Sequence, residues 1–253
     1  MKRVLTALVL ALVAFYSIFL APPAVFAAVV AAMACLCYSE FAGIAKANGV
    51  EGPLWLGYAA GLIAMWRPDT LPILIIVLLA VALKLADLSK VMGFVGTVAL
   101  GAIYIFLAWR WAFELREINR YWLLFALSIN WVGDIAAFYV GRSIGRHKLA
   151  RRISPGKSWE GAAASMAGAV AFGLWYGPYT GLTLPALQFA GLAAVANVAG
   201  QVGDLAESAL KRGAGVKDSG TLLPGHGGFL DRLDSTLFTL PVVLYFLKWV
   251  SGG

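Results

Sequence analysis

Acidic, basic and glycine residues gather in the segment from residue 201 to residue 235. The spacing places four residues on one face of a helix: Asp204, Glu207, Ser208 and Lys211. A Pro-Gly-His-Gly-Gly run follows at 224–228, and glycines let a backbone approach a ligand and offer N–H groups to anions. Carboxylates bind Mg²⁺ while Lys and Arg neutralise phosphate, so this mixture suits phosphoryl or nucleotidyl transfer.

A second charged segment, 141–160, carries six Lys or Arg against one Glu. It ends in turn residues before a predicted helix, where Ser158 can be the N-cap and Glu160 favours the positive helix end. A functional interpretation instead makes Ser154, Lys157 and Ser158 phosphate contacts at a helix N-terminus. The fragment is not a Walker loop, because the first glycine is missing at the required spacing.

These two segments hold six of the thirteen acidic residues and ten of the twenty Lys and Arg. Loops on a rigid scaffold often carry function, so we expect one site on a single face. The alternative is a set of solvated salt bridges at helix ends. A zinc site based on histidine is not expected, because His147 and His226 are far apart in sequence.

Composition places these segments in a membrane protein. The 253 residues are 61% hydrophobic and only 13% charged, with a mean hydropathy of +0.81. An average soluble domain is about 45–50% apolar, and two cysteines cannot form a disulfide scaffold. The net charge of +7 then reflects membrane orientation, and no nucleic-acid partner is expected.

The apolar runs predict an all-α, polytopic helical bundle with about nine transmembrane helices. The runs lie at 4–21, 24–44, 53–66, 71–86, 92–109, 121–140, 161–178, 183–201 and 236–250. We divide the chain into N-terminal membrane helices, 1–120, and a C-terminal catalytic region, 121–253. Lys2 and Arg3 place the N-terminus inside, so segments 141–160 and 201–235 are predicted to be cytoplasmic.

Two acidic residues lie within apolar runs. Asp134 is in the sixth run, where a central charge costs roughly 2.5–3.5 kcal/mol on insertion scales. It should therefore face the bundle interior or a water-filled cavity, either in a functional role or paired with a neighbour. Glu40 is near the end of the second run and is interpreted as interfacial.

The second half of the chain resembles the phosphatidate cytidylyltransferases, the CDP-diacylglycerol synthases. The signature-like pattern begins with Ser208-Ala-Leu-Lys211-Arg212 and continues with Lys217-Asp218-Ser-Gly220. It ends with Leu223-Pro224-Gly-His226-Gly227-Gly228-Phe-Leu-Asp231-Arg232-Leu-Asp234, without a departure from the family's pattern. The resemblance covers about 125–250, and the N-terminal half adds only several membrane helices and Ser39-Glu40-Phe41.

The resemblance implies that CTP and phosphatidic acid give CDP-diacylglycerol and pyrophosphate with Mg²⁺, through one or two metal ions. It implies a bacterial-type enzyme of the inner (cytoplasmic) membrane, in contact with membrane lipid and often a homodimer. On the matched positions, the implied metal ligands are Asp204, Asp231 and Asp234, which with Lys211 form the catalytic set. The implied substrate contacts are Ser154, Lys157, Ser158, Ser208, Arg212, Lys217, Asp218, His226, Gly227, Gly228 and Arg232.

Two rival functions remain open at this stage. A CTP-dependent lipid-alcohol kinase, acting on a polyprenol or phytol, would also combine membrane helices with CTP. A transporter or channel would use Asp134 and the loop charges for ions, but such proteins often show repeats and charges at mid-membrane. Here the charge is concentrated outside the apolar runs.

Overall fold

The computed structural model describes residues 11–223 and 227–250, and these residues are mostly helical. A helix occupies every predicted apolar run from 24–44 onward, which confirms an all-α membrane fold. Within the described residues, four helices are long and apolar enough to cross a membrane: Pro23–Ala47, Leu88–Ile118, Arg120–Ile144 and Ala186–Gly213. The predicted count of nine spans is therefore not confirmed.

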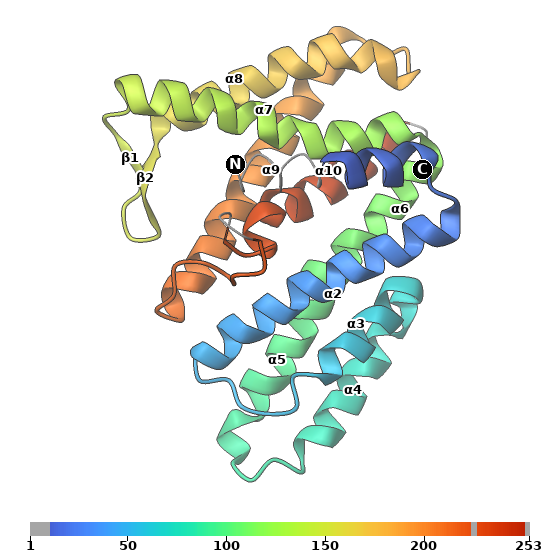
Figure 1. Cartoon of the computed structure of the whole chain (residues 1–253), viewed down its shortest axis with the longest axis vertical. Helices are drawn as coiled ribbons and strands as arrows, with labels where there is room; N and C mark the ends of the chain where they lie inside the picture. The colour runs from blue at the N-terminus through green and yellow to red at the C-terminus, as the bar shows by residue number, and fades with distance from the viewer. Residues whose placement is uncertain (1–10, 224–226, 251–253) are drawn as a thin grey trace. The chain divides into compact units, whose positions relative to one another are not determined.

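The chain divides into two compact units. Unit 1 comprises Met1–Arg110 and Leu210–Arg232. Its helices are α2 (Pro23–Ala47), α3 (Leu56–Trp66), α4 (Leu71–Ala82) and α5 (Val91–Gly101), and α5 continues through a π-helical turn, Ala102–Leu107 (Figure 1). Tyr38, Phe94 and Phe106 are fully buried in its core, and the Tyr38 hydroxyl donates to the Leu54 carbonyl at 2.8 Å.

Unit 2 comprises Trp111–Ala209 and Leu233–Gly253. Its elements are α6 (Ala108–Ile118), α7 (Arg120–Ile144), β1 (Lys148–Ala150), β2 (Ser154–Ser158), α8 (Trp159–Tyr176), α9 (Ala186–Gly213) and α10 (Asp234–Val250), of which α6 begins and α9 ends in unit 1. Helices α7 and α8 lie side by side (Figure 1). They approach closely where Gly141 faces Gly161, and Trp122 and Phe125 of α7 are buried in the core.

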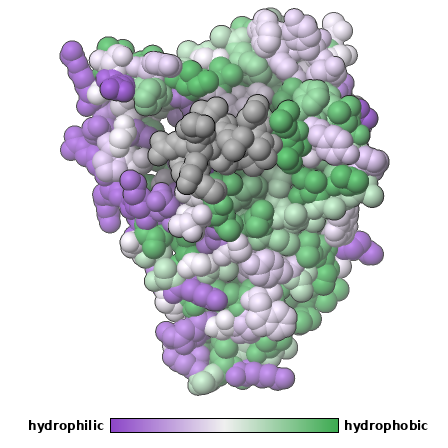
Figure 2. All heavy atoms as spheres, viewed as in Figure 1, coloured by the Kyte–Doolittle hydropathy of each residue, from purple (hydrophilic) through white to green (hydrophobic). Residues whose placement is uncertain are grey.

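Apolar side chains cover much of the outer surface. Ile73 and Ile76 on α4, and Leu83 directly after it, are each more than 60% exposed, and α4 carries no charged residue. Hydrophobic residues occupy much of the face drawn in Figure 2. A helix that is apolar all round and exposed in the isolated chain is suited to lipid contact.

The two charged segments, predicted as loops, contain secondary structure. Segment 141–160 forms an antiparallel hairpin in which Lys148 pairs with Ser158 and Ala150 with Ser154. Residues 154–158, predicted as a turn, are therefore its second strand. Segment 201–235 begins as helix, because α9 continues to Gly213. Ala, Leu and Lys in 205–212 are strong helix formers, and the glycines at 213 and 215 end the run.

Gly173 on α8 lies where α8 and α9 pack closely, and a substitution there tests this packing. A Cβ at this position would lie 2.6 Å from the Cβ of Ala193 on α9. Gly173→Ala is therefore expected to destabilise the protein by about 1–3 kcal/mol through overpacking, seen as a lower Tm in detergent.

The matched control is Gly191→Ala on α9, where a Cβ would meet nothing within 4 Å. This substitution should leave Tm unchanged or raise it, because alanine favours helix by about 0.5–1 kcal/mol over glycine. Equal Tm values for the two variants would contradict the packing described for Gly173.

Candidate functional site

Unit 2 contains a cavity of about 360 Å³ that is lined by both polar and apolar residues. Both signs of charge line it, with Arg142 and Lys157 as cations and Asp134 and Asp204 as acids. These side chains come from α7, β2 and α9, and α8 adds small residues such as Gly161. A concave site with a few convergent polar groups is where a small ligand is expected to bind.

An ion pair lies in the wall of this cavity. The Lys157 ammonium is 2.5 Å from a carboxylate oxygen of Asp204, and their side chains are 28% and 32% exposed. Ser208, one turn further along α9, donates to the other Asp204 oxygen at 3.4 Å. A partly exposed pair contributes only about 0–1 kcal/mol, so a phosphate can replace Asp204 beside Lys157 at little cost.

The N-terminus of α8 opens onto the same cavity. Ser158 is its N-cap, as predicted, and its hydroxyl accepts from the Gly161 N–H at 3.2 Å. Both residues line the cavity, so the positive end of the helix dipole faces it. Ser154 instead pairs with Ala150 in the hairpin.

A row of uncharged polar side chains, which was not predicted from the sequence, also lines the cavity. Gln201 donates to Asn197 at 2.7 Å, and Asn197 donates to the Ser165 hydroxyl at 3.1 Å. Asn130 is buried and donates to Thr239 on α10 at 2.8 Å. Asn and Gln inside apolar runs were the available signal, because polar side chains within membrane segments usually face the interior.

The base of the hairpin is held by Glu160. Its carboxylate accepts from the backbone N–H of His147 at 3.2 Å and lies 2.6 Å from the His147 Nδ1. Hydrogen bonds from its own backbone amide and from His147 lower the pKa of Glu160 to about 2. The carboxylate therefore stays ionised throughout the physiological pH range.

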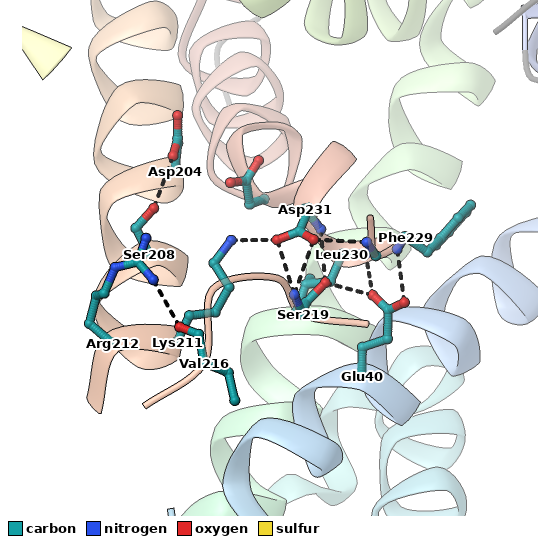
Figure 3. Close-up of polar contacts among 12 residues, drawn as sticks. Glu40, Asp204, Ser208, Lys211, Arg212, Val216, Ser219, Phe229, Leu230 and Asp231 are labelled. Carbon is teal, nitrogen blue, oxygen red and sulfur yellow. Dashed lines mark hydrogen bonds and ion pairs between the residues drawn. The ribbon is translucent and has the colours of Figure 1, made fainter. Parts of the chain in front are cut away.

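A second charged group lies in unit 1, around Asp231 (Figure 3). Lys211, near the end of α9, forms an ion pair with Asp231, and their side chains are only 10% and 8% exposed. The Asp231 carboxylate also accepts from the N–H groups of Ser219 at 3.1 Å and Gly228 at 2.8 Å. These donors keep the carboxylate in one orientation.

Glu40 takes part in this group, contrary to its interpretation as interfacial. It is 5% exposed on α2 and accepts hydrogen bonds from Ser219, Phe229 and Leu230 (Figure 3). The only signal for this role was weak: Glu40 is an acidic residue within an apolar run.

The other predicted contacts are distributed over the same segment. Arg212 donates to the Val216 carbonyl at 2.9 Å (Figure 3), and Lys217, Asp218 and Arg232 are exposed. Gly227 has a φ of +83°, a conformation that favours glycine, and forms a bridge with Leu223. His226 lies outside the described residues.

The predicted metal ligands fall into both units. Asp204 and Asp234 belong to unit 2, and Asp231 belongs to unit 1. Asp234 begins α10, where its carboxylate accepts from the Ser235 N–H at 2.6 Å. Within residues 11–223 and 227–250, no three His, Cys, Asp or Glu side chains gather as a metal site. The three-aspartate metal assignment stays a prediction.

The chain is similar to known proteins along its whole length. A sequence model described as "Cytidylyltransferase family" matches residues 1–250. A phosphatidate cytidylyltransferase of Bacillus subtilis is 34% identical over 261 residues, covering 97% of this chain and 96% of the relative. One of Pseudomonas aeruginosa is 35% identical over 267 residues, covering 99% of this chain and 97% of the relative.

The Glu160 contacts predict protection of the His147 amide from hydrogen exchange. Because the pKa of Glu160 is lowered to about 2, its support is present above the ordinary carboxyl pKa and is lost only as pH falls toward 2. The protection factor at pH 6 should equal that at pH 7, and Glu160→Gln should lower it at both.

Glu51→Gln is the control, because Glu51 is an exposed acid that pairs with Lys90 in another loop. Protection of the His147 amide that fell between pH 7 and pH 6, or survived Glu160→Gln, would contradict this description of the hairpin base.

Proposed function

The chain belongs to the cytidylyltransferase family, and we propose that it transfers the cytidylyl group of CTP to phosphatidic acid. The products are CDP-diacylglycerol, a precursor in phospholipid biosynthesis, and pyrophosphate. The similarity to two phosphatidate cytidylyltransferases over at least 96% of their length carries the proposal. A membrane fold suits a lipid substrate, and polar loops suit a soluble nucleotide.

The reaction needs phosphates brought together against their own repulsion. A phosphate oxygen of the lipid attacks the α-phosphorus of CTP, and the bond to the β-phosphate breaks to release pyrophosphate. No covalent enzyme intermediate is required, so catalysis depends on positioning and charge stabilisation. Lys157, Arg142 and the N-terminus of α8 supply positive charge around one cavity.

We infer that Mg²⁺ assists this reaction at Asp204. Mg²⁺ usually binds one or two protein carboxylates and completes its shell with water and substrate phosphates. Asp204 and Asp134 line the same cavity as Lys157, so the donor set suits that ion. When bound, the ion would neutralise charge on the triphosphate and orient it. Asp231 and Asp234 remain further predicted ligands.

The finer membrane arrangement is also a proposal. It comprises nine passes through the inner membrane of a bacterial cell, with segments 141–160 and 201–235 in the cytoplasm. The excess of Lys and Arg in segment 141–160 supports this orientation. A homodimer remains a prediction from the family resemblance.

The label that reaches the lipid distinguishes this reaction from that of a CTP-dependent lipid-alcohol kinase. Purified protein with Mg²⁺ and phosphatidic acid should move label from α-labelled CTP into lipid and release pyrophosphate. Label entering a polyprenol or phytol only from γ-labelled CTP would overturn the assignment. Solute uptake into proteoliposomes without CTP would instead favour a transporter.

Asp204→Asn is expected to lower kcat by about 100-fold or more, because a preorganised charged group facing the phosphates is lost. The loss should persist at saturating Mg²⁺, while Tm should change little because the Asp204 side chain is partly exposed. Asp87→Asn, in an exposed turn where Asp87 caps Ser89, is the matched control. Activity of the Asp204 variant within twofold of wild type would remove this role.

Asp231→Asn is expected to abolish turnover. The ion pair with Lys211 offers a double variant that controls for loss of folding. Because Lys211 is nearly buried beside Asp231, the single variant leaves a poorly compensated charge, which can cost about 3–5 kcal/mol. The double variant Lys211→Met with Asp231→Asn removes both charges and should recover stability without recovering turnover. An active double variant would contradict a catalytic role for the pair.

A further inference from the structure

Glu40 is a buried carboxylate in the N-terminal part of the chain. It lies on α2, is 5% exposed, and occupies a helix whose only other charged residue is Lys46. Burying a carboxylate is unfavourable unless hydrogen bonds replace its water. The groups that donate hydrogen bonds to Glu40 therefore indicate which segment its carboxylate positions.

Among the described residues, the hydrogen-bond partners of Glu40 all belong to the segment that carries Asp231. The Ser219 hydroxyl donates at 2.8 Å, the Phe229 N–H at 2.9 Å and the Leu230 N–H at 2.8 Å. Phe229 and Leu230 stand at the start of a short 3-10 turn, Leu230–Arg232. N–H groups at the start of a helical turn have no partner within it, and an anion there satisfies them.

Ser219 links Glu40 to Asp231 directly. Its hydroxyl donates to Glu40 and accepts from the backbone N–H of Asp231 at 3.3 Å, while its own N–H donates to the Asp231 carboxylate at 3.1 Å (Figure 3). Two carboxylates therefore hold the segment: Glu40, which belongs to α2, and Asp231, which belongs to the segment itself.

Two glycines make room for the Glu40 carboxylate. A Cβ at Gly228 would lie 2.6 Å from the Glu40 Oε2, and a Cβ at Gly220 would also be closer than 3 Å to the carboxyl group. Glycine at both positions therefore lets the backbone close around the carboxylate.

We propose that Glu40 is a positioning residue for turnover. It fixes residues 219–231 so that the Asp231 carboxylate meets Lys211 in one orientation, and it acts through this segment without touching substrate. The proposal rests on the proposed function of Asp231, and its test includes a measurement that does not depend on activity.

The variants are Glu40→Gln, Ser219→Ala, the double variant, and Glu51→Gln as an exposed control in the same unit. Glutamine keeps the shape of Glu40 but turns an NH₂ group toward donors. We expect Glu40→Gln to lower kcat by at least 10-fold with the KM for CTP within threefold of wild type. Glu51→Gln should change neither.

The double variant separates positioning from general destabilisation. Because Ser219 connects Glu40 to Asp231, both substitutions break the same connection. The kcat of the double variant should therefore be within threefold of the kcat of the less active single variant. Independent losses that multiply would overturn the proposal, as would a Glu40→Gln kcat within twofold of wild type. A loss confined to Tm, with kcat of the folded fraction unchanged, would assign Glu40 a structural role only.

Hydrogen exchange tests the arrangement without activity. Amides of 228–231 should exchange at least 10-fold faster in Glu40→Gln, while amides of the 148–158 hairpin keep their rates. Unchanged exchange at 228–231 would overturn the proposal. If the wild-type protein made no CDP-diacylglycerol, the proposed function would fail, whereas accelerated exchange would still support Glu40 as the residue that holds the segment.

Discussion

Buried carboxylates in this largely apolar chain need hydrogen-bond donors, and the polar segments supply them. An unpaired charge removed from water costs several kcal/mol even after relaxation, and a chain with 61% hydrophobic residues offers few polar surroundings. Glu40 takes three donors from residues 219–230, and Asp231 takes Lys211 and two backbone N–H groups. These bonds hold residues 219–231 of the segment after α9 together.

The two lysine–carboxylate pairs differ in burial, and this difference suggests different tasks. Lys211 and Asp231 are at most 10% exposed, so opening that pair leaves charges poorly solvated and the pair holds its geometry. The side chains of Lys157 and Asp204 are 28% and 32% exposed, so water and salt weaken their attraction. Under the proposed function, Lys157 would change partner from Asp204 to a substrate phosphate, whereas Lys211 would keep a fixed arrangement with Asp231.

The sequence predicted the features that depend on local patterns. Long apolar runs predicted the helices, Ser158 predicted the N-cap of α8, and the motif at 208–234 carried the resemblance to the family. Each of these follows from residues close together in the chain. The number of membrane passes was harder to predict, because helices such as α3 and α4 are short for a transmembrane helix.

Features that depend on distant residues were missed. Nothing near Glu40 indicates that it meets residues 219–230, which lie about 180 positions later. The row of Asn197, Gln201 and Ser165 likewise joins two helices through side chains that look isolated in sequence. The hairpin at 148–158 was missed because two short strands with Pro155 and Gly156 carry little strand propensity.

Chemical labelling of Lys157 tests the central claim most directly, that this amine leaves Asp204 to hold a substrate phosphate. The wild-type protein would be treated with an amine-reactive reagent, with and without Mg²⁺, phosphatidic acid and a non-hydrolysable CTP analogue, and labelling read by mass spectrometry. The substrates should lower labelling of Lys157 at least 10-fold and leave the exposed Lys84 unchanged. Equal labelling of Lys157 in the free and substrate-saturated protein would contradict the account.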